Sequence, residues 1–301
     1  MIMTKGNSTL KYHGMMVFLI IVWGLEFSIA RGALEYVNAM VLLNTKYLLG
    51  ALFIAVIALR TKKARLPEKK DLPLIFVTTF VGHILYYCGV YTAMETIPVA
   101  NITVILGFLP LGSVLVEKIL FQKRMSRILV LLMIGCVAGI FMTIGADWTS
   151  LFSGKGAGYL MCALALVSWL AYLFLTGQLT EKYGAMNIAL YQTTLAFLMT
   201  APVVVPHLEE IPQLPPVILL QMIYLGVVNE GLCFLIEVTG LDRLGPTVSA
   251  VYSNFLPVTT AFFGWLILGQ NLGPLQCAGG AIVIICGFFI IRERERLGRN
   301  G

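Results

Sequence analysis

The hydrophobic residues of this chain gather in ten long runs, and short polar segments separate them. A helix needs about 20 mostly apolar residues to cross the hydrocarbon core of a bilayer. The runs are continuous rather than alternating, which favours helices over strands. The predicted membrane-spanning helices cover residues 14–34, 41–60, 73–93, 99–121, 128–146, 157–178, 186–206, 217–239, 247–268 and 274–291.

The second half of the chain repeats the first at a spacing of 147 residues. This shift places Phe108–Pro110 on Phe255–Pro257 and Thr92 on Thr239, with no gap between them. Because each copy holds an odd number of spans, the second copy enters the membrane upside down relative to the first.

The predicted fold is therefore an all-α integral membrane protein. Its ten transmembrane helices form two inverted five-helix repeats, residues 1–146 and 147–301. Composition agrees, because 58% of the residues are hydrophobic and 12% are charged, whereas about 25% of the residues in soluble domains are charged.

Charge predicts the orientation. If the N-terminus is cytoplasmic, 17 of the 21 lysines and arginines fall in cytoplasmic segments. The positive-inside rule then places both termini in the cytoplasm. The net charge of +6 is explained by the anionic headgroups on that side, so we expect the lipid bilayer and no nucleic acid as a partner.

The sequence contains no nucleophile elbow, no zinc-protease motif and no phosphate-binding loop. We therefore predict that the protein is not an enzyme and that it holds no cofactor or metal. An inverted repeat in a membrane protein is typical of alternating-access transporters, and a transporter without a nucleotide site would draw on a gradient. All six cysteines lie inside predicted spans and are interpreted as packing residues.

Several motifs together resemble a known family. They are Trp23-Gly24 with Phe27 on the first helix, Pro110 and Pro257 on the fourth and ninth, and glycines on the fifth and tenth helices. The chain resembles the drug/metabolite transporter superfamily, EamA type, over essentially its whole length. The resemblance implies that helices 1–4 and 6–9 surround a central substrate cavity, with helices 5 and 10 at the periphery.

Ionisable residues inside the spans are the first candidates for function. A carboxylate in the membrane centre is costly unless it faces a cavity or a partner. The 147-residue shift places His83 on Glu230, and Glu26 lies just outward of the middle of helix 1. We predict that Glu26, His83 and Glu230 couple protons to transport. Alternatively, these groups only form hydrogen bonds between helices. Lys46 is expected near the outer end of helix 2, too far out to bind an anionic substrate deep in the site.

Aromatic residues occupy the same depth, including Tyr86 and Tyr91, and with carboxylates they could hold an organic cation or simply pack the bundle. The predicted gating residues are Pro110 and Pro257. Asn101 and Thr103 are polar positions on the fourth helix. The predicted substrate-binding residues are Trp23, Glu26, His83, Tyr87, Trp169, Tyr172, Glu230, Phe234, Tyr252 and Asn254.

These features predict a secondary active exporter of a small organic metabolite that bears an amine or is zwitterionic. It would work by alternating access with proton exchange, as a monomer or homodimer in a bacterial or archaeal cytoplasmic membrane. An uncoupled facilitator of amino acids or similar metabolites is the first alternative. An intramembrane enzyme or a receptor is the remote one.

Overall fold

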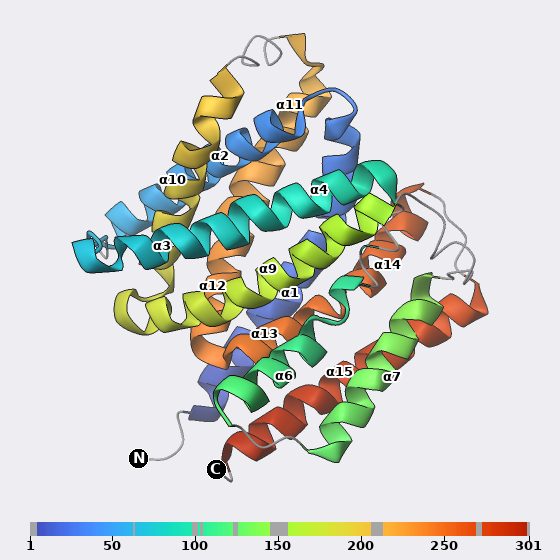
Figure 1. Ribbon diagram of the computed structural model, residues 1–301. Helices are drawn as coiled ribbons and strands as arrows, with labels where there is room; N and C mark the ends of the chain where they lie inside the picture. The colour runs from blue at the N-terminus through green and yellow to red at the C-terminus, as the bar shows by residue number, and fades with distance from the viewer. Residues whose placement is uncertain are drawn as a thin grey trace.

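The structure is a computed structural model that describes residues 5–62, 64–97, 102, 105–122, 126–144, 156–205, 213–268 and 273–299. Over these residues all regular secondary structure is helical, and the helices form one bundle (Figure 1). Asn101 and Thr103, named above as polar positions, lie outside the described residues.

The third and eighth predicted spans are long helical segments, each with a π-helical stretch in the middle. The elements of the first half are α1 (Lys5–Leu34), α2 (Ala39–Arg60), η1 (Lys69–Asp71), α3 (Leu72–Thr79), the π-helical η2 (Phe80–Leu85), α4 (Tyr86–Thr96), α6 (Leu109–Leu120) and α7 (Arg127–Ile144). Those of the second half are α9 (Gly156–Tyr183), α10 (Ala185–Val204), α11 (Pro216–Ile223), the π-helical η4 (Tyr224–Cys233), α12 (Phe234–Leu244), α13 (Pro246–Ser253), α14 (Leu256–Leu268) and α15 (Pro274–Arg299).

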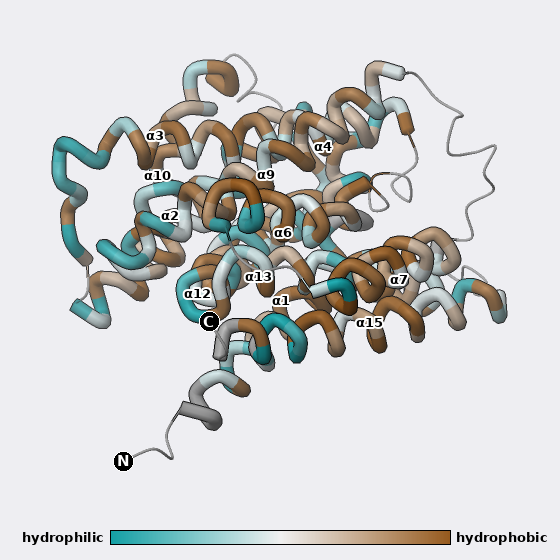
Figure 2. Tube along the Cα trace, turned by 60° about the horizontal axis from the view of Figure 1, so that its bottom comes forward, coloured by the Kyte–Doolittle hydropathy of each residue, from teal (hydrophilic) through white to brown (hydrophobic). Residues whose placement is uncertain are grey.

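Among the residues that the structure describes, seven helical segments are long and apolar enough to cross a membrane, and a shorter apolar helix covers Arg127–Thr143. Hydrophobic side chains also point outward, as on α7 and α15, where Leu131 and Phe288 are exposed. Figure 2 shows hydrophobic residues along most of the helix lengths, with hydrophilic ones mainly towards helix ends and loops. An apolar exterior of this kind fits lipid rather than water, so the chain is a multi-pass membrane protein.

The ninth span is broken in the structure, although the sequence predicted one helix over 247–268. Helix α13 ends at Ser253, and α14 begins at Leu256 with Pro257 in its first turn. A proline ring clashes with the carbonyl four residues earlier and is tolerated best at the start of a helix, so the break falls just before it. Pro110 has the same position in the first turn of α6.

The 147-residue shift also relates the helix boundaries. Helix α6 starts at Leu109 and α14 at Leu256, which is 256 − 109 = 147. Helices α7 and α15 start at 127 and 274, again 147 apart. The stretch η2, moved by 147, covers 227–232 and falls inside η4. Two pairs of helices with equivalent positions also pack on each other, α2 on α10 and α7 on α15 (Figure 1).

Helices α7 and α15 approach closely because small residues meet along the contact. A Cβ added to Gly279 would lie 2.4 Å from the backbone nitrogen of Thr143 and 2.6 Å from the carbonyl oxygen of Gly139. Packing of this kind drives helix association in lipid, where burial of apolar surface contributes little.

Candidate substrate cavity and its buried ion pairs

A cavity lies among α1, α4, α9, the start of α6 and the break between α13 and α14. Its aromatic lining is Trp23, Tyr86, Tyr87, Tyr91 and Trp169. Its other lining residues are Glu26, Ala30, Val90, Met94, Leu106, Leu109, Ser253, Leu256 and Pro257. Within the described part of the chain, Glu26 is therefore the charged side chain of the cavity wall.

Helical spacing explains which residues line the cavity. Tyr87, Val90, Tyr91 and Met94 follow the i, i+3, i+4, i+7 pattern that marks one face of a helix, here α4. Trp23, Glu26 and Ala30 do the same on α1. Met94 was not predicted as a site residue, and this spacing was the signal that could have identified it.

The aromatic rings of the wall touch one another. The Trp169 ring lies 4.6 Å from Tyr86 and 6.3 Å from Trp23, centroid to centroid, and the Trp23 contact is edge to face. Two polar atoms of this wall are unsatisfied. The indole N–H of Trp23 and the hydroxyl of Tyr91 have no hydrogen-bond partner within the described residues. Buried polar groups usually have a partner, so these two are available to a ligand.

Lys46 pairs with Glu26, although its position in the sequence predicted that it lies too far out to take part in the site. Its Nζ atom donates to Oε1 of Glu26 at 2.6 Å and lies 4.0 Å from the centroid of the Tyr87 ring. Lys46 is 1% exposed. The expectation was wrong because the position of Lys46 along its span does not show how far its long side chain reaches. In the structure the Lys46 ammonium lies inside the bundle, next to the carboxylates of Glu26 and Glu230.

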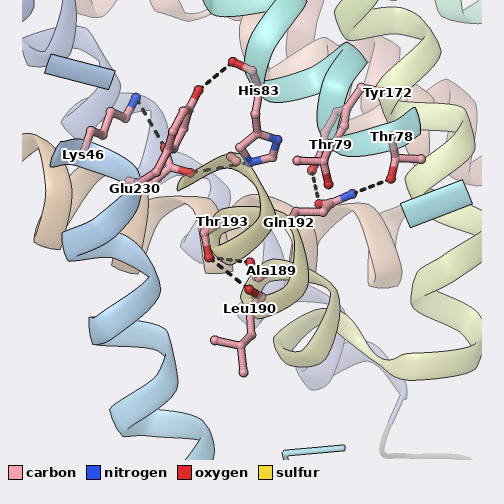
Figure 3. A network of polar contacts seen from close by, with 12 residues as sticks. Lys46, Thr78, Thr79, His83, Tyr172, Ala189, Leu190, Gln192, Thr193 and Glu230 are labelled. Atoms are coloured by element: carbon pink, nitrogen blue, oxygen red, sulfur yellow. Dashed lines mark hydrogen bonds and ion pairs between the residues drawn. The ribbon is translucent and has the colours of Figure 1, made fainter. Parts of the chain in front are cut away.

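Glu230 lies on the other side of Lys46 and faces His83, as the repeat suggested. Its Oε2 atom is 3.4 Å from the Lys46 Nζ, and its Oε1 is 3.5 Å from Nε2 of His83 (Figure 3). His83 lies in η2 and Glu230 in η4. Single π-helical turns often occur at functional sites, because the wider turn redirects a side chain. In the described structure neither residue lines the cavity.

Gly50, one turn after Lys46, makes room for Glu230. A Cβ on Gly50 would lie 2.6 Å from Cγ of Glu230, closer than packed carbon atoms come. This close approach of α2 to η4 brings the Lys46 ammonium and the Glu230 carboxylate together.

The other predicted site residues lie behind or beside the cavity. Tyr172 stacks on Trp169 at 4.7 Å, and the Phe234 ring lies 4.7 Å from that of His83. Asn254 is 1% exposed and lies at the break between α13 and α14. Tyr252 contacts His13 at the other end of α1. Of the predicted set, Trp23, Glu26, Tyr87, Trp169 and Pro257 line the cavity.

An apolar helical bundle with an internal cavity fits a membrane transporter, and the comparisons with known proteins support this class. The model of the EamA-like transporter family matches residues 10–145 and 156–292. The chain belongs to this family.

Relatives carry transporter names. The chain is 22% identical over 275 residues to "Uncharacterized transporter YdfC" of Bacillus subtilis (strain 168), which covers 90% of this chain and 87% of that one. It is 22% identical over 290 residues to "Probable terminal-alkyne amino-acid exporter" of Streptantibioticus cattleyicolor, covering 95% and 94%. One solved crystal structure aligns with a TM-score of 0.73 at 18% identity, covering 92% of this chain and 95% of that chain, and this likeness shows the fold alone.

Proposed function

We propose that this protein is a secondary active exporter of small zwitterionic or amine-bearing metabolites. The observation that carries the proposal is the aromatic cavity whose wall contains the Glu26 carboxylate. A carboxylate among aromatic faces attracts an ammonium group by charge and by cation–π interaction. The similarity to a protein named as an amino-acid exporter supports the same substrate class.

Two features favour a zwitterion over a simple amine. The unsatisfied N–H of Trp23 can donate to a substrate carboxylate, and the hydroxyl of Tyr91 can do the same. Both atoms belong to the cavity wall that also holds Glu26. The Lys46 ammonium beside Glu26 reduces the net negative charge, which makes the site less suited to a dication.

We propose alternating access between two inverted five-helix repeats, with both termini in the cytoplasm of a bacterial or archaeal cell. The matching helix boundaries at a spacing of 147 residues support the repeat. The cavity includes Ala30 and Met94, close to the ends of α1 and α4 at Leu34 and Thr96. With cytoplasmic termini these ends lie in the outer half of the membrane, which supports assigning the cavity to an outward-facing state in this scheme.

Proton exchange is the proposed coupling. A proton and a substrate ammonium would compete for Glu26, so amine binding should weaken as the pH falls. The alternative is an uncoupled facilitator, in which a pH gradient would not drive transport.

Proteoliposomes containing the purified protein test the proposal. The probes are phenylalanine, phenethylamine, which lacks the carboxylate, and N-acetylphenylalanine, which lacks the ammonium. We expect exchange of the first two and not of the third, and loss of exchange in Glu26→Gln. Transport of N-acetylphenylalanine at an equal rate would contradict the proposal. Accumulation against a gradient when a pH difference is imposed would separate an exporter from a facilitator.

A further inference from the structure

Lys46 is shared unequally between two carboxylates. Its ammonium is 2.6 Å from Glu26 and 3.4 Å from Glu230. Glu26 belongs to the cavity wall, whereas Glu230 lies behind Lys46, where α2 packs on η4. Lys46 therefore connects the cavity to a contact between the two halves of the chain.

Glu230 is incompletely paired in this arrangement. Its contacts with Lys46 and His83 are 3.4 and 3.5 Å long, and a charge-assisted hydrogen bond is shorter, about 2.7–2.9 Å. Its Oε1 atom has no hydrogen-bond partner within the described residues. Glu230 is only 1% exposed, so water gives it little compensation. A movement of the ammonium by less than about 1 Å would give Glu230 a close partner.

We propose that Lys46 is a positioning residue that exchanges partners when substrate binds. The proposal rests on the proposed function, in which a substrate ammonium binds Glu26. In the empty cavity Lys46 neutralises Glu26. When the substrate ammonium takes its place, Lys46 moves onto Glu230. No covalent bond changes and no proton moves.

The count of charges favours this exchange. Without substrate, Glu26 and Glu230 share the single ammonium of Lys46. With substrate, each carboxylate has a cation of its own. The contact between α2 and η4 would then differ between the empty and loaded states, which gives substrate binding a route to the packing of the two halves.

Binding of phenethylamine to the purified full chain in lipid nanodiscs tests the exchange. In Glu230→Gln, Lys46 keeps Glu26 as its remaining carboxylate and competes with the ligand, so we expect affinity to fall by about tenfold or more. In Lys46→Met/Glu230→Gln the internal competitor is gone, and we expect affinity at or above that of the unmodified protein.

Glu237→Gln is the matched control. Glu237 lies seven residues further along the same helical segment, is 2% exposed, and forms no ion pair with Lys46 in the described structure. Its substitution makes the same chemical change at a buried glutamate that does not contact Lys46, and we expect affinity to change by less than about twofold. Equal weakening by Glu230→Gln and Glu237→Gln would overturn the exchange and leave the proposed function standing.

Infrared difference spectra of the unmodified protein give a direct readout. Phenethylamine should shift the carboxylate band of Glu230, identified by its loss in Lys46→Met/Glu230→Gln, although Glu230 does not line the described cavity. This measurement holds even if Glu230→Gln alone does not fold. Binding without a shift of that band would overturn the exchange. No binding of phenethylamine or phenylalanine to the unmodified protein would overturn both the exchange and the proposed function.

Discussion

Nδ1 of His13 and the hydroxyl of Tyr252 lie 2.7 Å apart, in a hydrogen bond whose donor depends on the imidazole tautomer. The contact joins the first part of α1 to α13, across 239 residues of sequence. Met16, Leu19 and Val248 are buried in the same cluster as Tyr252. The end of α1 away from the cavity is therefore closed by side chains from both halves of the chain.

Tyr252→Phe should weaken this closure and favour the state open on the His13 side. A cysteine at Ser249, which is 1% exposed, should then react faster with a small thiol reagent than the same cysteine with Tyr252 intact. The rates are compared in a background without the native cysteines. Tyr36→Phe is the control, because Tyr36 is 56% exposed. Unchanged reactivity of the cysteine would exclude a gating role for the His13–Tyr252 contact.

The predicted orientation can be tested with two cysteines. With both termini cytoplasmic, Gln213→Cys should react with an impermeant thiol reagent added outside intact cells. Lys70→Cys should react only after the membrane is permeabilised, although Lys70 is 72% exposed in the structure. The prediction follows from the excess of basic residues in the predicted cytoplasmic segments. The opposite labelling pattern would invert the topology and the assigned direction of the cavity.

Replacing Lys46 alone should destabilise the fold more than replacing Lys46, Glu26 and Glu230 together by uncharged residues. Lys46→Met leaves Glu26 and Glu230 buried without their shared cation, and breaking a buried pair in this way costs about 3–5 kcal/mol. Lys46→Met/Glu26→Gln/Glu230→Gln leaves no formal charge among these three residues and should recover most of the thermal stability. Denaturation of the purified proteins in one detergent gives the comparison. Equal stability of the two variants would show that the pairing contributes little.

Gly50→Ala should disturb the ion pairs through sterics alone. The added Cβ would lie 2.6 Å from Cγ of Glu230, so α2 or η4 must shift. Overpacking of this kind costs about 1–3 kcal/mol, and we expect lower thermal stability and weaker amine binding. Gly14→Ala is the matched control on α1, because a Cβ there meets nothing within 4 Å. If both variants bind and unfold alike, the close approach at Gly50 has no role in the site.

The sequence by itself determined the class of the protein. Its long apolar runs specify membrane helices because lipid leaves backbone polar groups no partner outside the segment. The 147-residue shift placed His83 and Glu230 at equivalent positions, and the two side chains are 3.5 Å apart, although neither lines the described cavity. Trp23 and Glu26 were expected at a cavity, and they line one.

Tertiary structure alone decided how the buried charges pair and which aromatic rings form the wall. Lys46 looked remote because its position in a span does not show where its long side chain ends. Only the close packing of α2 on η4, allowed by Gly50, brings its ammonium between Glu26 and Glu230. Likewise, Tyr252 and Trp169 are both aromatic residues at a similar predicted depth, yet one contacts His13 and the other lines the cavity. Depth follows from position along a helix, whereas the partner of a side chain depends on how the helices pack around it.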